Sequence, residues 1–175
     1  MDKLNNIDQK ILIYVQNWRR PLLNKFFIYF TMTGTGRAWF IVVVVLNVLN
    51  FANVRFYENQ NQILRSMIPS LLTWVISTAL KRIVSRARPA DSIPGYVRNA
   101  DSPQCGSFPS SHSATAFAFF AALLFISHPL TPFVGLWAVF IAFSRLYLGV
   151  HYLSDIIGGI VLGIGIATLL QNIII

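Results

Sequence analysis

The sequence predicts an all-α fold: an integral-membrane helical bundle of five to six spans, forming a single domain over residues 1–175. Charged residues make up only 11% of the chain and hydrophobic residues 55%, whereas a soluble domain carries roughly a quarter charged residues. Five apolar segments each approach the ~20 residues that a helix needs to cross ~30 Å of hydrocarbon. The length of 175 residues allows one domain.

Residues 1–34 are predicted to form an amphipathic helical region that lies at the membrane interface. Apolar residues are interleaved with polar ones, and Arg19 and Arg20 interrupt any clean span. Trp18 and these cations would be anchored among lipid headgroups. Pro21 is expected to break the region into two helices. The competing interpretation is a sixth, tilted span.

Five apolar segments follow and define the predicted transmembrane helices. They run approximately over 37–54, 62–81, 112–128, 131–148 and 155–174. All are somewhat short, which indicates a compact bundle with polar ends. In the last segment Gly159 and Gly163 form a G-x-x-x-G spacing, which permits close helix packing and is interpreted as structural.

A long polar connection over 82–111 is predicted to be the active-site loop. It is rich in Pro, Ser, Gly and charge, and a loop of this length in an economical chain is usually functional. With five spans, this loop, the turn at 149–154 and the N-terminal region fall on one side. Cys105 is the only cysteine, so an internal disulfide is excluded.

The chain is basic, with a formal net charge of +8. Such a balance suits nucleic acid, anionic lipid or phosphate-bearing substrates. No folded basic module is left over that could hold a duplex, so the expected partners are membrane lipids and an anionic substrate, not nucleic acid. The densest cluster lies between two apolar runs and comprises Lys81, Arg82, Arg86, Arg88 and Arg98.

Lys81 and Arg88 form the first candidate anion site. If the helix continues through 81–88, the seven-residue step is two turns and both side chains point from one face. Arg82 and Arg86 would then meet headgroups or solvent. Arginine can hold two phosphate oxygens, and lysine adds a point charge. The simpler alternative is a basic flank that anchors the span.

The second candidate, Ser110-Ser111-His112, directly precedes an apolar segment. Ser110 is a preferred N-cap residue whose hydroxyl can donate to a phosphate oxygen, and free N–H groups at a helix start can bind an anion. His112 can act as an acid near neutral pH. The alternative is an ordinary capped helix with a surface histidine. His128, between two spans, is assigned no role.

Arg145, His151 and Asp155 form the third candidate. His151 and Asp155 are four residues apart, so on a helix they face the same way. A carboxylate bonded to one ring nitrogen fixes the tautomer and raises the basicity of the other nitrogen. Leu148-Gly149 is expected to turn the chain so that Arg145 and His151 converge. The alternative is a buried His–Asp pair that closes a helix end.

In chain order the three clusters give K-x6-R-P, P-S-S-H and S-R-x5-H-x3-D over roughly residues 81–155. The pattern closely resembles the type 2 phosphatidic acid phosphatase family of membrane lipid phosphatases, and the related vanadium-dependent haloperoxidases that share its phosphate pocket. The resemblance implies that His151 attacks phosphorus to form a phosphohistidine, that Asp155 orients it, and that His112 protonates the leaving oxygen. The residues that would hold the phosphoryl oxygens are Lys81, Arg88, Ser110, Arg145 and the backbone near Ser111.

The resemblance also implies that no metal or other cofactor is needed, because fixed cations stabilise the transferred phosphoryl group. One position departs from the family pattern, since the family usually has glycine where this chain has Ser111. A serine keeps the backbone N–H, but its Cβ would be strained if the position required a positive φ.

The implied activity is removal of a terminal phosphate from a lipid at the outer face of a bacterial-type inner membrane. The chain would be multi-pass, with its site facing the periplasmic or extracellular side. Candidate substrates, by family analogy, are lipid A 1-phosphate, undecaprenyl diphosphate and phosphatidylglycerol phosphate. Two alternatives stay open: a vanadate-dependent haloperoxidase-like enzyme, disfavoured by the apolar segments, and a non-enzymatic lipid-phosphate binding or transport protein, disfavoured by the complete histidine and aspartate set.

Overall fold

The computed structural model describes residues 2–51, 60–100 and 105–174, and every regular element in these ranges is a helix. The predicted all-α class is therefore confirmed. The end of the predicted 37–54 segment and part of the predicted loop lie outside the described residues. In chain order the helices are α1 (Asp2–Gln16), α2 (Pro21–Met32), α3 (Gly36–Phe51), α4 (Gln60–Val84), α5 (Pro89–Ser92), α6 (Ser111–Phe125), α7 (Thr131–Tyr147), α8 (Leu153–Leu169) and α9 (Gln171–Ile174).

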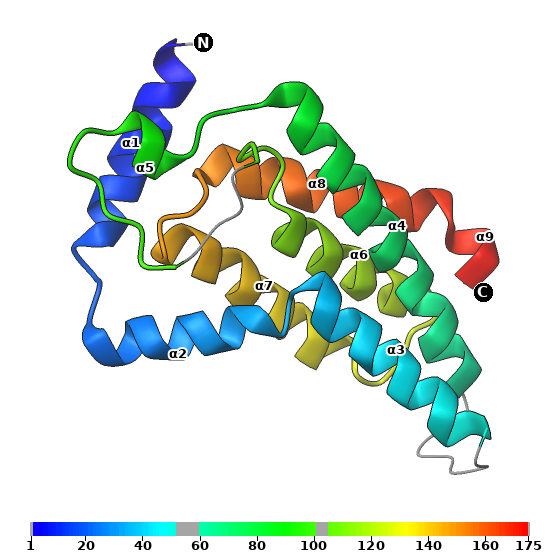
Figure 1. Ribbon diagram of the computed structural model, residues 1–175. Helices are drawn as coiled ribbons and strands as arrows, with labels where there is room; N and C mark the ends of the chain where they lie inside the picture. Colours follow the sequence, from blue (N-terminus) through cyan, green and yellow to red (C-terminus); the bar gives the residue numbers. More distant parts are fainter. Residues whose placement is uncertain (1, 52–59, 101–104, 175) are drawn as a thin grey trace.

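Helix α6 is the centre of the bundle (Figure 1). It packs most extensively against α8, then against α4 and α7, while α3 packs along the outer side of α4. Helix α2 lies against α7, and α1 contacts both α7 and α8. The C-terminal ends of α4 and α7 meet the N-terminal ends of α6 and α8 at one end of the bundle (Figure 1). Every predicted cluster lies at this end.

Small residues let α6 approach its neighbours closely. A Cβ added at Gly163 of α8 would stand 2.1 Å from the carbonyl oxygen of Ala114 on α6, so only glycine fits there. On the other side, the Ser70 hydroxyl of α4 donates to the Thr115 carbonyl of α6 at 3.1 Å. This packing agrees with the structural role predicted for the G-x-x-x-G spacing. Four hydroxyl residues at helical spacing are buried along α4: Ser66, Ser70, Thr73 and Ser77.

The outer faces of the helices carry large apolar side chains. Phe40, Val48, Phe133 and Val161 are each more than half exposed, which suits a surface bathed in hydrocarbon better than one in water. In the described ranges, one stretch, Arg65–Ser92, which contains most of α4, is long and apolar enough to cross a membrane by length and composition. Helices α6, α7 and α8 are shorter apolar helices of 15, 17 and 17 residues. The number of spans stays a prediction.

The N-terminal region is divided as predicted, with a break between α1 and α2. Pro21 is the first residue of α2, a position where its missing N–H leaves no bond unmade. Helix α1 buries Leu12 and Val15 in the core and exposes Tyr14, and Trp18, which follows the helix, is exposed as well. It is therefore packed on the bundle by one face, and its placement at a membrane interface stays a prediction.

The condition for a shared helical face of Lys81 and Arg88, that the helix continues through 81–88, is not met. Helix α4 ends at Val84, and Ser85 adopts a φ of 47° that turns the chain away from the helix axis. Arg88 is extended, with φ −80° and ψ 160°, because the proline that follows disfavours helical backbone at the preceding residue. The chain then forms the short helix α5 inside the predicted loop.

Candidate active site

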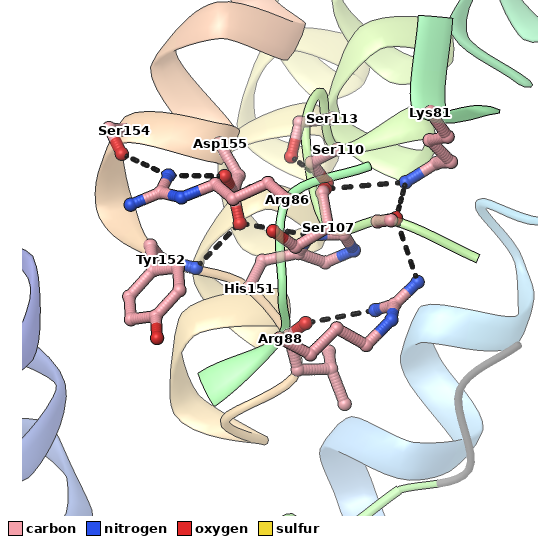
Figure 2. A network of polar contacts seen from close by, with 12 residues as sticks. Lys81, Arg86, Arg88, Ser107, Ser110, Ser113, His151, Tyr152, Ser154 and Asp155 are labelled. Atoms are coloured by element: carbon pink, nitrogen blue, oxygen red, sulfur yellow. Dashed lines mark hydrogen bonds and ion pairs between the residues drawn. The ribbon is translucent and has the colours of Figure 1, made fainter. Parts of the chain in front are cut away.

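The eight predicted site residues lie at or next to the ends of α4, α6, α7 and α8 that meet at one end of the bundle. Figure 2 shows part of this set, namely Lys81, Arg88, Ser110, His151 and Asp155. Ser111 and His112 are half-buried, and the other six are buried. Those six are Lys81, Arg88, Ser110, Arg145, His151 and Asp155. Three of the buried side chains are cations, and a cationic site shielded from bulk water favours binding of an anion.

Lys81 and Arg88 converge on one stretch of the loop although no single helix carries both. Lys81 Nζ donates to the carbonyls of Gly106 and Ser107 at 3.5 and 3.4 Å. Arg88 donates to the carbonyls of Cys105, Gly106 and Val150 at 3.1, 3.4 and 3.0 Å. Their shared contact at Gly106 fixes the two cationic groups relative to each other.

Ser110 is the N-cap of α6, as predicted. Its hydroxyl accepts a hydrogen bond from the Ser113 hydroxyl at 3.0 Å, and its backbone N–H donates to the Asp155 carbonyl at 2.9 Å. The second bond ties the start of α6 to the first turn of α8. This hydrogen bond therefore holds two predicted site residues, Ser110 and Asp155, next to each other.

Ser111 is accommodated without backbone strain. It is the first residue of α6, and its φ is not positive, so a Cβ is tolerated there. Its hydroxyl is hydrogen-bonded to that of Ser77 on α4 at 2.9 Å. The departure from the family's glycine therefore adds an interhelical contact. His112 follows on the same helix and lines a separate cavity, described below.

His151 and Asp155 are in contact, but not on one helix. His151 precedes the Tyr152 N-cap of α8, where the backbone is extended, so the prediction of a shared helical face is wrong. Tyr152 N–H donates to Asp155 Oδ2 at 3.0 Å. The Nδ1 atom of His151 lies 3.5 Å from the same oxygen and makes no hydrogen bond. The carboxylate is thus held in place while facing the imidazole.

Burial and positive neighbours act together on His151, which is 2% exposed. Burial, followed by repulsion from Lys81, Arg145 and Arg88, holds the pKa of His151 well below its ordinary value of 6.5. The imidazole is therefore neutral at neutral pH, with a lone pair available for nucleophilic attack.

Arg145 completes the set of buried cations. It lies in the last turn of α7, and its NH1 donates to the Thr31 hydroxyl on α2 at 3.0 Å. Its Nε is buried without a hydrogen-bond partner among the described residues. After α7 the chain turns through Leu148-Gly149, with a φ of 75° at Gly149, as predicted. An unused donor on a buried guanidinium is suited to an anionic ligand.

Two openings reach the site from different directions. A cleft of about 610 Å³ is lined by basic side chains, among them Lys81, Arg82, Arg88 and Arg98, and also by Cys105. A second cavity, of about 330 Å³, contains the side chain of His112. This cavity shares Gly36, Arg37 and Trp74 with an apolar groove of about 540 Å³ between α3 and α4. One opening is polar and the other leads to an apolar surface.

Arg86 is a site residue that the sequence reasoning missed. The expectation that it faces headgroups or solvent is wrong, because its guanidinium forms ion pairs with Asp155 at 2.6 Å and Asp8 at 2.9 Å. The small number of acidic residues could have indicated this role, since the chain has only 6 acidic residues against 14 basic ones. A buried acid in such a chain needs a basic partner.

Two further expectations can be placed in the structure. His128 closes the turn between α6 and α7, where its Nδ1 accepts the Leu130 N–H at 3.2 Å, far along the chain from the predicted clusters. Within the described ranges, no three His, Cys, Asp or Glu side chains gather as a metal site would require.

Residues 63–174 match the model of the PAP2 superfamily, a region that includes all eight predicted site residues. The chain is 29% identical over 173 residues to a lipid A 4'-phosphatase of Bacteroides thetaiotaomicron, covering 91% of this chain and 73% of the relative. It is 27% identical over 157 residues to phosphatidylglycerophosphatase B of Bacillus subtilis, covering 83% and 72%. A decaprenylphosphoryl-5-phosphoribose phosphatase of Mycobacterium tuberculosis is 36% identical over 98 residues, covering 56% and 53%.

Two solved structures share this fold. A transmembrane PAP2-type phosphatidylglycerolphosphate phosphatase from Bacillus subtilis superposes with a TM-score of 0.77 at 24% identity, covering 98% of this chain and 86% of that one. LpxE of Aquifex aeolicus superposes with a TM-score of 0.72 at 25% identity, covering 91% and 92%.

Proposed function

This chain belongs to the PAP2 superfamily, and on that premise we propose that it hydrolyses a terminal phosphate from a membrane lipid phosphate or diphosphate through a phosphohistidine intermediate. The observation that carries the proposal is the convergence of three buried cations with two histidines and a carboxylate at one end of an apolar bundle. The relatives named above are phosphatases of several lipids, which supports the substrate class. The specific candidates remain lipid A 1-phosphate, undecaprenyl diphosphate and phosphatidylglycerol phosphate.

His151 is the nucleophile in this mechanism. Its Nδ1 faces Asp155, so Nε2 attacks phosphorus while the bond from phosphorus to the lipid oxygen breaks. The negative charge of the bound phosphate group favours the protonated form of His112. His112 gives its proton to that oxygen, and the dephosphorylated lipid leaves. Asp155 stabilises the positive charge that the phosphorylated imidazole acquires.

Water completes the cycle. His112, now neutral, takes a proton from a water molecule whose oxygen attacks phosphorus, and the bond from phosphorus to Nε2 breaks. Inorganic phosphate is released and both histidines return to their initial states. The net reaction consumes one water molecule for each phosphate removed.

The cations hold the phosphoryl group through both steps. Lys81, Arg88 and Arg145 surround the position beside His151, and the Ser110 hydroxyl and the backbone N–H groups near Ser111 add neutral donors. Phosphoryl transfer needs positioning and stabilisation of charge on the oxygens, which these groups supply without a metal ion.

The two openings suit the two products. His112, the proton donor to the lipid oxygen, lies on the side that leads to the apolar groove between α3 and α4. A lipid chain in this groove places its oxygen next to His112, and Arg37 and Trp74 stand at the junction. Inorganic phosphate leaves through the basic cleft that contains Lys81 and Arg88.

The remaining placement is also proposed. The chain acts as one membrane-embedded domain with five spans formed by α3, α4, α6, α7 and α8, and α1 and α2 lie at the interface. The exposed apolar faces support the spans, and the site opens on the outer side of a bacterial-type inner membrane. Its partners are the surrounding lipids and the anionic substrate.

The test uses the full chain, purified in detergent and reconstituted in vesicles. A panel of lipid monophosphates and diphosphates is offered, and released phosphate is measured with the parent, His151→Asn and the matched control His128→Asn, which lies outside the site. We expect release only from the parent and the control. An acid-labile, alkali-stable phosphoenzyme trapped from a ³²P-labelled lipid would identify the intermediate.

The alternatives correspond to other outcomes. Bromide oxidation by the protein with added vanadate would favour the haloperoxidase-like reading. Absence of phosphate release from every lipid, with retained lipid-phosphate binding, would favour a binding protein. Full activity in His151→Asn would exclude the mechanism proposed above.

A further inference from the structure

A carboxylate and a cation that the mechanism does not use lie directly behind Asp155. Arg86 NH1 donates to Asp155 Oδ1 at 2.6 Å, and Arg86 NH2 donates to Asp8 Oδ2 at 2.9 Å. The guanidinium also lies over the ring of Tyr152, 4.3 Å from its centroid. Figure 2 shows Arg86 reaching the oxygen of Asp155 that does not face His151. Arg86 therefore bridges the orienting carboxylate to a second one on the N-terminal helix.

Asp8 is buried, at 2% exposure, although α1 was expected to do no more than anchor the chain. Its Oδ1 accepts the backbone N–H of Ser154 at 3.1 Å, and its Oδ2 accepts the Ser154 hydroxyl. Leu12 and Val15 lie four and seven residues further on, along the same buried side of α1. The packing of α1 thus fixes Asp8 at the first turn of α8, which also carries Asp155.

The charges in this cluster have a consequence for His151. Two carboxylates and one guanidinium leave one net negative charge, whereas Arg86 alone would neutralise Asp155. Because Arg86 is shared with Asp8, it does not fully neutralise Asp155. The remaining negative charge stabilises the imidazole, which becomes positive when it is phosphorylated. The two ion pairs also hold the carboxylate from behind, so it cannot rotate away from the ring.

We propose that Asp8 and Arg86 are positioning residues for His151, which fix the Asp155 carboxylate and set the charge that the imidazole meets. Helix α1 is then a part of the active site and not only a membrane anchor. Both residues act through His151, so this inference rests on the proposed function.

The other charged groups around His151 come from every helix end at the site. They are Lys81 of α4, His112 of α6, Arg145 of α7, Asp155 of α8, and Arg88, the N-cap residue of α5. Lys81, Arg88 and Arg145 are cations, so Asp155 is the sole source of negative charge among these five residues. A change of one charge behind Asp155 is therefore expected to move the protonation of His151 measurably.

The principal variant is Asp8→Asn, which keeps an oxygen for Ser154 and removes one negative charge. We expect kcat to fall about 10- to 100-fold, as for other outer partners of a functional histidine, with little change in KM because the phosphate-holding cations are intact. The acid limb of kcat/KM should move to lower pH by about one unit, since a less negative surrounding disfavours the imidazolium.

The second variant, Arg86→Gln, removes a positive charge and should move the acid limb in the opposite direction, to higher pH. Asp8→Glu should restore part of the kcat lost in Asp8→Asn. All profiles use the same lipid substrate in vesicles, so its own titration cancels in the comparison. The matched control is Lys10→Gln, which removes one exposed charge from α1 and should change neither kcat nor the acid limb.

Opposite pH shifts would not arise from a general loss of structure. Normal kcat and an unshifted acid limb in Asp8→Asn, with His151→Asn inactive, would overturn this inference and leave the proposed function standing. Loss of activity in both variants with unshifted limbs and lowered thermal stability would also overturn it, in favour of a structural ion pair. Full activity in His151→Asn would overturn the proposed function and this inference together.

Discussion

At the residue scale, the site depends on cations that are buried before any substrate arrives. Lys81 and Arg88 are held by loop carbonyls, and Arg145 by a hydroxyl of α2. Backbone carbonyls partly compensate a buried charge without neutralising it, so the site keeps its attraction for an anion. Burial, together with these positive charges, lowers the pKa of His151 and favours its neutral form.

The pH dependence of catalysis follows from this environment. In the proposed mechanism the nucleophilic imidazole must be neutral, so activity is expected to be lost as the pH falls through the pKa of His151 in the folded enzyme. Because that pKa is lowered from 6.5, the acid limb of kcat/KM is expected below pH 6.5. The measurement is a pH–rate profile corrected for the titration of the lipid phosphate. An acid limb above the ordinary histidine value would contradict the assignment.

Ser111 offers a second prediction, about stability. Ser111→Gly should lower the free energy of unfolding by about 1–2 kcal/mol, through backbone freedom in a helix and the lost hydrogen bond to Ser77. A double-mutant cycle with Ser77→Ala, followed by thermal unfolding in detergent, should give a coupling of about 1 kcal/mol. Strict additivity of the two changes would show that the 2.9 Å contact contributes nothing.

At the element scale, helix ends assemble the site and close helix packing holds those ends together. Helix α6 carries Ser110, Ser111 and His112 at its start, and its contact with α8 depends on the absence of side chains. The carbonyl oxygen of Ala114 would be 2.1 Å from a Cβ at Gly163. Displacement of α8 would carry Asp155 with it.

Two glycines on α8 provide a matched test of this packing. Gly163→Ala should destabilise the protein by about 1–3 kcal/mol, because a backbone atom must move to admit the methyl group. Gly165→Ala meets nothing within 4 Å and should be neutral or stabilising, by up to about 1 kcal/mol of helix propensity. Thermal unfolding of the two variants compares them directly, and equal midpoints would contradict the packing argument.

At the scale of the whole molecule, the apolar sides and the basic end fit a bundle that crosses a membrane. The proposed orientation can be tested with Cys105, the only cysteine, which is half-buried and lines the basic cleft. A membrane-impermeant maleimide is expected to label it in intact spheroplasts, and vanadate in the pocket should slow the labelling. A Cys105→Ser variant gives the background, and labelling that requires permeabilised cells would reverse the orientation.

The sequence could predict features that depend on neighbours along the chain. The span at 131–148 corresponds to α7, Thr131–Tyr147, and the N-cap at Ser110 follows from local preference. The convergence of Lys81 with Arg88 was expected from a continuous helix, but it depends on a turn at Ser85, whose backbone is left-handed. Hydrophobic periodicity does not reveal such a turn. The contact between Arg86 and Asp8 spans 78 residues, and no local pattern specifies a long-range ion pair.

The short helices of the bundle have a consequence for the lipid around it. At ~1.5 Å per residue, the 17 residues of α7 or α8 reach about 26 Å, less than the ~30 Å of a typical hydrocarbon layer. Such hydrophobic mismatch is relieved by local thinning of the bilayer next to the protein. Phosphate groups of neighbouring lipids would then sink toward the midplane, level with the buried cations. Vesicles of longer-chain lipids should therefore slow the enzyme, while thinner bilayers favour it.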